Sequence, residues 1–365
     1  MDITDLLVLT KERGASDLHL TAGAPPTLRI HGKLVRLDGG TLGREEIHAM
    51  LYDILTDQQK ARFEATHDLD LSLELASVGR FRVNAFMQRL GEGMVMRLIP
   101  ATISTLDQLG MPPVLKDLAL RGRGLVLITG PTGSGKSTTL AAMVHHRNEA
   151  QEDHIITIED PIEFVHAPRK CNINQREVGP HTDSFAAALR SALREDPDVI
   201  LVGEMRDLET IALALTAAET GHLVLATLHT NSAAQSVTRI VDAFPAHQQE
   251  QIRTQLAEAV LGVVAQTLIP TADGQGRVAA VEVMVATPAV RNMIRENKTH
   301  QLPSAIQTGA RDGMQSLDQH LKTLVKLRKI NQDEAIKRAE HPDALLQERG
   351  ATAGMEVLGP VPRRS

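Results

Sequence analysis

The sequence predicts an α/β protein in which a small α+β domain precedes a larger domain with a mostly parallel sheet and a helical C-terminal part. From Gly124 onward, short apolar runs alternate with helical patterns, which is typical of a parallel sheet covered by helices on both faces. Residues 1–99 instead show a denser mixture of short helices and strands. Between the two regions, residues 100–113 hold three prolines and one glycine, which indicates a linker.

The first domain is expected to span residues 1–99. Helical spacing of apolar residues predicts a helix at residues 3–13, a polar helix is expected at residues 44–65, and alternation of apolar and polar residues predicts strands. Gly32 lies between two short apolar stretches, as in a hairpin. The expected strands are 17–21, a hairpin within 28–37, 69–75, 80–88 and 93–99.

A linker is expected over residues 100–123 and the second domain over residues 124–345. The expected parallel strands of this domain are 125–129, 155–158, 199–202 and 223–227. Helices are expected to dominate residues 246–341. Residues 346–365 are expected to form a disordered tail, because their glycines, prolines and terminal arginines cannot build a packed core.

Composition limits the class of protein. Apolar residues make up 42% of the chain and charged residues 23%, as in soluble globular proteins. No stretch reaches the roughly 18 consecutive apolar residues that a membrane span requires, and the N-terminus lacks a signal-peptide pattern. The single cysteine, Cys171, excludes an internal disulfide and fits a reducing compartment. A cytoplasmic protein is therefore expected.

The charge balance argues against a nucleic-acid partner. The net charge is −6, and aromatic residues are 2% of the chain, with no Trp and one Tyr. Nucleic-acid-binding proteins usually present a basic surface and, for single strands, aromatic rings on which bases stack. We therefore expect no nucleic-acid partner.

Residues 125–138 read LVLITGPTGSGKST and have the spacing of a P-loop between a strand and a helix. The glycines permit positive φ and let the backbone approach a phosphate group closely, while loop N–H groups and the helix N-terminus face the anion. Lys136 would reach the terminal phosphates, and the Ser137 hydroxyl would ligate Mg²⁺. The expected ATP-binding residues are Gly130, Thr132, Gly133, Ser134, Gly135, Lys136, Ser137 and Thr138.

A second apolar strand, residues 199–202, is followed by Gly203 and Glu204. Ligands of open parallel sheets bind at the carboxyl ends of the strands, so Glu204 is expected to face the γ-phosphate and to orient or deprotonate the attacking water. The Asp that usually precedes this acid and supports Mg²⁺ is replaced by Gly203. The alternative is a surface acid at a strand end.

Further polar side chains follow the other expected strands. Glu159, Asp160 and Glu163 come after residues 155–158, and their mutual repulsion indicates a nearby cation, for which Mg²⁺ is the simplest choice. The alternative is a solvated acidic turn. His222 and His229 flank the strand at 223–227, and either could be structural. The expected metal-binding residues are thus Ser137, Glu159 and Glu163.

The end of the first domain is rich in arginine. Solvated strand faces explain most such arginines, but some could reach an ATP bound by a neighbouring subunit and stabilise transition-state charge. The residues concerned are Arg80, Arg82, Arg89 and Arg97.

Four segments together resemble the type II/IV secretion ATPase superfamily, hexameric motors of RecA-like fold. They are GPTGSGKST at 130–138, ITIEDPIE at 156–163, DPDVILVGEMRD at 196–207 and TGHLVLATLHTNSA at 220–233. Within that superfamily the chain is most similar to the pilus-retraction, or twitching-motility, ATPases. The segments that carry this closer similarity are GASDLHL at 14–20, GRFRVNAF at 79–86, CNINQREVG at 171–179 and AVRNMIRE at 289–296, the last resembling a segment associated with retraction.

The resemblance implies a PAS-like first domain, a RecA-like second domain and a homo-hexamer that binds ATP and Mg²⁺. It also implies an inner-membrane pilus platform protein and the pilus machinery as partners, with the ring peripheral to the cytoplasmic face of the inner membrane. The catalytic residues carried over are Glu204, Glu163 and His229, with Arg82 and Arg97 as arginine fingers.

Other functions remain open at this point. A motor for pilus extension or type II secretion usually has a longer N-terminal region and a four-cysteine zinc segment, whereas this chain has only Cys171. A retraction accessory paralogue would share the motor fold. A DNA-translocating ATPase would need a basic groove, and a non-catalytic scaffold would not need Lys136, Ser137 and Glu204.

Overall fold

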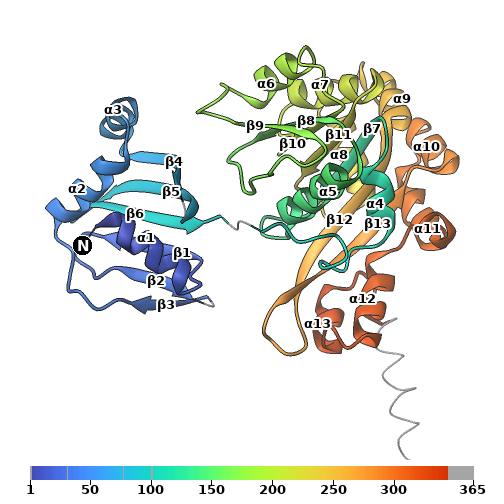
Figure 1. Cartoon of the computed structure of the whole chain (residues 1–365). Coiled ribbons are helices and arrows are strands. Elements are labelled where there is room, and N and C mark those ends of the chain that lie inside the picture. The colour runs from blue at the N-terminus through green and yellow to red at the C-terminus, as the bar shows by residue number, and fades with distance from the viewer. Residues whose placement is uncertain (1, 31, 77, 100–101, 344–365) are drawn as a thin grey trace, which may run out of the picture. The chain divides into compact units, whose positions relative to one another are not determined.

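The computed structural model describes residues 2–30, 32–76, 78–99 and 102–343 (Figure 1). Contacts divide the chain into two compact units, residues 1–102 with 163–165 and residues 103–162 with 166–365. The α/β fold class, with the smaller α+β unit first and helices at the C-terminal end, is confirmed. The tail expected at residues 346–365 lies outside the described residues.

The first unit is an antiparallel sheet with helices against one core. Its strand order is β3-β2-β1-β6-β5-β4, and inward residues of the sheet share a single apolar cluster with the three helices. The strands are β1 (Asp17–Thr21), β2 (Thr27–Ile30), β3 (Lys33–Arg36), β4 (Asp68–Leu75), β5 (Gly79–Gln88) and β6 (Gly91–Leu98). The helices are α1 (Ile3–Glu12), α2 (Arg44–Ile54) and α3 (Asp57–Thr66).

The single helix expected at residues 44–65 is wrong, because two helices occupy this range. A capping box starts the second helix: Gln59 N–H donates to Thr56 Oγ1, and Thr56 N–H donates to Gln59 Oε1. The T-x-x-Q pattern of this capping box is present in the sequence, but the break between the two helices was missed because the whole segment is polar.

The second unit is built on a mostly parallel sheet, as predicted. Its order is β13-β12-β7-β11-β10-β8-β9, and among the described strands of this sheet only β12 and β13 pair antiparallel. The strands expected at 125–129, 155–158, 199–202 and 223–227 are confirmed. The strands are β7 (Gly124–Thr129), β8 (His154–Glu159), β9 (Asn172–Glu177), β10 (Val199–Val202), β11 (Leu223–Leu228), β12 (Val260–Pro270) and β13 (Arg277–Val285).

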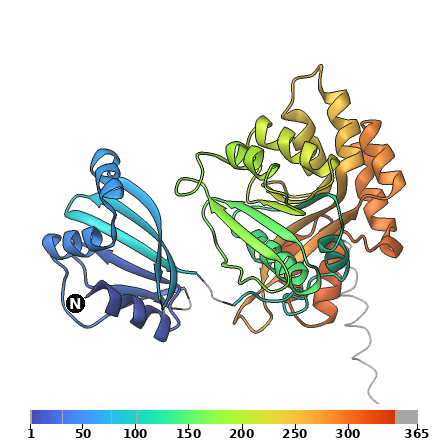
Figure 2. The ribbon, with the colours of Figure 1, turned by 45° about the horizontal axis from the view of Figure 1, so that its top comes forward.

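Helices cover both faces of this sheet (Figure 1, Figure 2). Alternate residues of β7 face opposite layers: Leu125 and Leu127 pack with α6–α11, whereas Val126 and Ile128 pack with α4 and α5. Among the described residues, no helix has the length and apolarity needed to cross a bilayer. The helices are α4 (Val114–Ala119), α5 (Lys136–Ala150), α6 (Phe185–Ala192), α7 (Leu208–Glu219), α8 (Ala233–Asp242), α9 (Gln249–Ala259), α10 (Pro288–Arg295), α11 (Leu302–Thr308), α12 (Leu317–Lys326) and α13 (Gln332–Arg338).

Three strands differ from the sequence prediction. Helices were expected to dominate residues 246–341, but β12 and β13 lie inside this range. β12 pairs with β7 on one side and with β13 on the other, so most of its residues are buried and no alternation marks it as a strand. β9 was missed because it is a polar edge strand.

Part of the segment expected as a linker, 100–123, is ordered structure of the second unit. Residues 114–119 form α4, and Leu115 and Leu118 are buried in the core beside α5. Pro113 is the N-cap residue directly before the helix, a place that suits proline because it has no N–H to satisfy. The prolines therefore mark the beginning of α4 as well as the change of unit.

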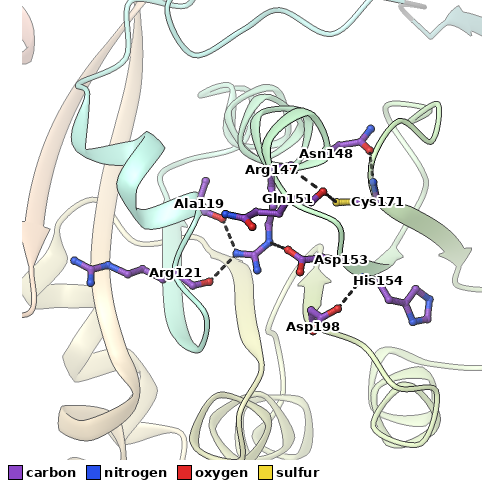
Figure 3. Close-up of polar contacts among 9 residues, drawn as sticks. All are labelled: Ala119, Arg121, Arg147, Asn148, Gln151, Asp153, His154, Cys171 and Asp198. Atoms are coloured by element: carbon purple, nitrogen blue, oxygen red, sulfur yellow. Dashed lines mark hydrogen bonds and ion pairs between the residues drawn. The ribbon is translucent and has the colours of Figure 1, made fainter.

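A buried arginine anchors the C-terminal end of α5 (Figure 3). Arg147, only 5% exposed, pairs with Asp153 at 2.6 Å. Its Nη1 donates to the carbonyl oxygen of Ala119, the last residue of α4, at 2.9 Å, and to that of Arg121, two residues later, at 2.6 Å. A cation at a helix C-terminus also interacts favourably with the helix dipole. This contact fixes α4 and α5 to each other.

We predict that Asp153→Asn lowers the free energy of unfolding by about 3 kcal/mol, because it leaves a buried guanidinium without its counter-charge. The matched control is Asp107→Asn, since Asp107 is 73% exposed and pairs with Lys116 at 2.7 Å. Loss of that exposed pair is expected to cost under about 1 kcal/mol. Urea unfolding measures both variants, and equal losses would contradict a structural role for the buried pair.

Candidate active site

The C-terminal ends of β7, β11, β10 and β8 meet at one edge of the second sheet because these strands run parallel in register. Backbone hydrogen bonds continue past the strand ends, for example from Gly203 N–H to the carbonyl of Ile158 at 2.8 Å. This edge contains Glu159, the last residue of β8, and the loops that leave it contain the P-loop, Glu204 and His229. Residues up to about a hundred positions apart in the sequence therefore lie together at this edge of the sheet.

The P-loop joins β7 to α5 and turns through glycines of positive φ, namely Gly130 (141°), Gly133 (79°) and Gly135 (89°). Gly135 is the N-cap of α5, so Lys136, Ser137 and Thr138 form the first turn of the helix. A helix N-terminus with free N–H groups favours an anion. Thr132 is exposed and Ser134 is buried in the turn. The geometry suits phosphate binding by the residues expected from the sequence.

Lys136 folds back over the loop that precedes it. Its ammonium group donates to the carbonyl oxygens of Gly130 at 2.8 Å and Pro131 at 3.1 Å. The ammonium group is therefore held over the P-loop, where the oxygen atoms of a phosphate bound by the loop could accept hydrogen bonds from it. Phosphate oxygens are stronger acceptors for it than neutral carbonyls.

Glu204 is held by two basic side chains. Its Oε1 lies 3.1 Å from His229 Nε2 and its Oε2 accepts a hydrogen bond from Arg206 at 2.7 Å. Burial opposes ionisation of Glu204, but the hydrogen bond from Arg206 and the nearby His229 outweigh it and hold the pKa of this carboxyl below its usual value. Glu204 is therefore an ionised carboxylate at neutral pH. The resemblance named Glu204 and His229 as site residues, but their contact was not foreseen and Arg206 was missed.

Gly203 explains why no acid precedes Glu204. A Cβ at this position would lie 3.1 Å from the carbonyl oxygen of Ile158 and 3.3 Å from Cα of Glu159. The Gly203 carbonyl also accepts a hydrogen bond from Thr227 Oγ1 at 2.5 Å. Close packing of β10 against β8 thus leaves little room for a side chain at position 203.

The acidic segment does not act as one cluster in this structure. Glu159 Oε1 accepts hydrogen bonds from Thr157 Oγ1 at 2.6 Å and Gln175 Nε2 at 3.2 Å. Glu163 belongs to residues 163–165, which group with the first unit. No group of three or more His, Cys, Asp or Glu side chains among the described residues could by itself hold a metal ion. A Mg²⁺ ion bound mainly by nucleotide oxygens and water needs no such cluster.

The two histidines that flank β11 have different surroundings. His222 lies at the N-terminal end of the strand, where its Nδ1 contacts the carbonyl of Ala217 at 3.0 Å. His229 lies at the other end, beside Glu204. His222 is therefore a structural residue, and His229 is the histidine of the candidate site.

A cavity of about 830 Å³ lies beside the P-loop. It is bordered by Gly135 and Thr138 of the P-loop region and by Gln108, Arg277 and Lys329 from other elements. Drug-sized ligands and nucleosides fit pockets of ~300–1,000 Å³. The cavity adjoins the phosphate-binding turn, as a pocket for the remainder of a nucleotide must.

In the first unit, Arg82 on β5 and Arg97 on β6 are directly opposite each other in the ladder. Arg97 Nε donates to Asp17 at 2.8 Å, and Arg82 lies 3.8 Å from Asp70. Like charges directly opposite in a sheet destabilise it, so these acids offset the repulsion. The structure brings Arg82 and Arg97 together on one face of the sheet.

The segment AVRNMIRE forms most of α10, and its first arginine has a structural partner. Arg291 Nη1 donates to the carbonyl oxygens of Ala257 at 2.5 Å and Glu258 at 2.6 Å. Helix ends leave such carbonyls without helical partners, so Arg291 caps the C-terminal end of α9. Arg295 of the same segment is exposed.

Glu282 on β13 was not expected to bear on the site. It is 6% exposed, and its Oε1 accepts a hydrogen bond from Ala233 N–H at 2.7 Å, at the start of α8. It borders a cavity of about 170 Å³ with Pro131 of the P-loop and Asn231, two residues after His229. Burial raises the pKa of Glu282 to about 7, although the hydrogen bond from Ala233 acts in the opposite direction.

Comparison with known proteins identifies the family. The family model described as type II/IV secretion system protein matches residues 12–337. The chain is 55% identical over 343 residues to the type IV pilus retraction ATPase PilT of Pseudomonas aeruginosa, covering 94% of this chain and 99% of the relative. It is 43% identical to the type IV pilus ATPase PilU of the same organism, covering 94% of this chain and 90% of that one.

A solved structure is also similar along the whole chain. The crystal structure of the pilus retraction motor PilT with bound ADP matches with a TM-score of 0.89 and 46% identity, covering 95% of this chain and 99% of that one. Both units therefore have counterparts in a protein solved with a nucleotide.

We predict that Glu282→Gln stabilises the protein more at pH 8 than at pH 5. In the unfolded chain this carboxyl ionises at about pH 4.5, whereas in the folded protein it ionises only at about pH 7. The free energy of unfolding of the wild type therefore decreases as the pH rises between these two values. The amide oxygen of Gln keeps the acceptor for Ala233 but does not ionise. Thermal melts at both pH values measure the difference between variant and wild type. A difference that is the same at pH 5 and pH 8 would contradict titration of Glu282.

Proposed function

Because the chain belongs to the type II/IV secretion system protein family, we propose that it is a motor ATPase that hydrolyses ATP to retract type IV pili and so drives twitching motility. The observation that carries this proposal is that the similarity to a retraction ATPase extends through both units at 55% identity. The P-loop, Glu204 and His229, which suit ATP hydrolysis, lie at one edge of the second sheet.

ATP binding follows from the P-loop. The N–H groups of Gly133 and Gly135 and the N-terminus of α5 would surround the phosphates, and Lys136 would neutralise the terminal charge. The cavity beside Thr138 would hold the nucleoside. The proposed Mg²⁺-binding residues are Ser137 and, in the acidic segment, Glu159 and Glu163. Bound Mg²⁺ would neutralise charge on the β- and γ-phosphates.

Hydrolysis would depend on Glu204 as an ionised carboxylate. A carboxyl whose pKa is lowered is a weak base, so its main role would be to orient the attacking water. Arg206 and His229 would hold the two oxygens of this carboxylate in place. His229 also follows directly after β11, which pairs with β7, the strand that leads into the P-loop. From this position its side chain could respond to the presence of the γ-phosphate.

Arg82 and Arg97 would complete the site of a neighbouring subunit. Adjacent arginines on one sheet face match the several oxygens of a polyphosphate. This arrangement requires a ring, and we propose a homo-hexamer in which hydrolysis moves the first unit of one subunit against the second unit of the next. Its partners would be an inner-membrane pilus platform protein and the pilus machinery, at the cytoplasmic face of the inner membrane. No nucleic-acid partner is proposed.

We predict that Glu204→Gln binds ATP as the wild type does but hydrolyses it about 10²–10⁴-fold more slowly, because water is no longer oriented by a carboxylate. Glu209→Gln is the matched control, since Glu209 is an exposed glutamate paired with Arg190 on the neighbouring helix. Nucleotide binding and steady-state phosphate release measure the two effects separately. Undiminished turnover in Glu204→Gln would contradict a catalytic role for Glu204.

In vivo, cells that lack this gene should carry an excess of surface pili, because fibres are assembled but not withdrawn. Electron microscopy of pilus number measures this, and a gene encoding Glu204→Gln should fail to restore the normal number. Bare cells would instead indicate an assembly motor. An unchanged number would indicate an accessory paralogue or another transport system.

A further inference from the structure

Gln266 lies at the point where β12 passes the P-loop. Ala265 is the partner of Thr129, the last residue of β7, so Gln266 is level with the start of the loop. Its side chain is 4% exposed, although a glutamine amide has four hydrogen-bonding positions to satisfy. A buried amide at this place needs an explanation.

The amide contacts the loop and the helix that follows it. Nε2 donates to the carbonyl oxygen of Ser134 at 2.7 Å, and Oε1 accepts from Thr139 Oγ1 at 2.8 Å. The direction of the amide is fixed, because a carbonyl oxygen can only accept and must therefore face the NH₂ group. Gln266 thus joins the turn of the P-loop to the first part of α5.

The same residue accounts for two of the P-loop glycines. A Cβ at Gly130 would lie 2.2 Å from the backbone oxygen of Gln266, and a Cβ at Gly135 would lie 2.8 Å from its Nε2. Both distances are far below van der Waals contact, and the first involves backbone that cannot move aside easily. Gln266 therefore packs against both ends of the loop.

The hydrogen bond to Ser134 also sets the direction of a neighbouring N–H group. In a planar trans peptide, the C=O and the N–H point in opposite directions. Because the Ser134 carbonyl points toward Gln266, the Gly135 N–H points away from β12. We propose that Gln266 is a positioning residue that directs the Gly135 N–H toward the nucleotide phosphates. The inference rests on the proposed ATP-binding function and deepens it.

The first test replaces Gln266 by Met, which keeps the length and apolar packing but loses both hydrogen bonds. The affinity of the full chain for ADP with Mg²⁺ should fall about tenfold, because a buried polar contact that fixes a phosphate donor is lost. Hydrolysis should show a higher KM with little change in kcat, since the N–H contact acts on bound ATP and on the transition state alike.

Thr139 supplies matched variants. Thr139→Ser keeps the hydroxyl and should bind ADP as the wild type does. Thr139→Val removes only the hydrogen bond to Oε1 and should weaken binding by about threefold, since Gln266 still reaches Ser134. A loss of affinity in Thr139→Ser equal to that in Thr139→Val would contradict the role of the hydroxyl.

A second variant covers the case in which Gln266→Met does not fold. Gln266→Glu is nearly isosteric and keeps the acceptor for Thr139, but its ionised carboxylate faces the Ser134 carbonyl and repels it. The protonated form can donate to that carbonyl. The affinity of Gln266→Glu for ADP relative to wild type should therefore fall as the pH rises and the introduced carboxyl ionises.

The outcomes separate the inference from the proposed function. Wild type that neither binds ADP nor hydrolyses ATP would overturn the proposed function itself. Wild type that binds ADP, with Gln266→Met and Gln266→Glu binding equally well at every pH, would overturn the inference alone. A lower melting temperature with unchanged ADP affinity would assign Gln266 to stability only, which also overturns it.

Discussion

The close approach of β12 to the P-loop is the contact on which the arrangement of the second unit depends. The first half of β12 pairs with β7, and the strand then passes the loop so closely that Gly130 cannot carry a side chain. This approach holds the phosphate-binding turn against a fixed strand. The next strands, β11 and β10, then bring His229 and Glu204 to the same edge through their register with β7. A rigid turn and a fixed register together set the relation between the phosphates and the carboxylate.

Several parts of this arrangement could be predicted from the sequence. The strands at 125–129, 155–158, 199–202 and 223–227 were found because each is a short apolar run followed by a loop or a helical pattern. β12 could not be identified, because a strand buried on both faces has the same local pattern as a buried helix. The role of Gln266 was out of reach for another reason: its partners Thr139 and Ser134 lie 127 and 132 residues away. Local patterns carry no information about such pairs.

Charge is distributed along α5 in a way that suits its dipole. The glycine-rich N-terminus attracts an anion, while Arg147 lies at the C-terminal end and pairs with Asp153. At the site edge, the basic partners of Glu204 keep it ionised, and burial has the opposite effect on Glu282. The pKa values of these two carboxyls are thereby shifted in opposite directions, that of Glu204 downward by its basic partners and that of Glu282 upward to about 7 by burial.

The anchoring of α5 at both ends has a mechanical consequence. Its 15 residues form a stiff rod of about 22 Å. Near the C-terminal end of that rod, Asn148 accepts hydrogen bonds from the backbone N–H groups of Arg169 and Cys171 and donates to the carbonyl of Ala167. Because the helix is stiff, the phosphate-binding turn at its N-terminus and residues 167–171 near its C-terminal end are held at a fixed separation.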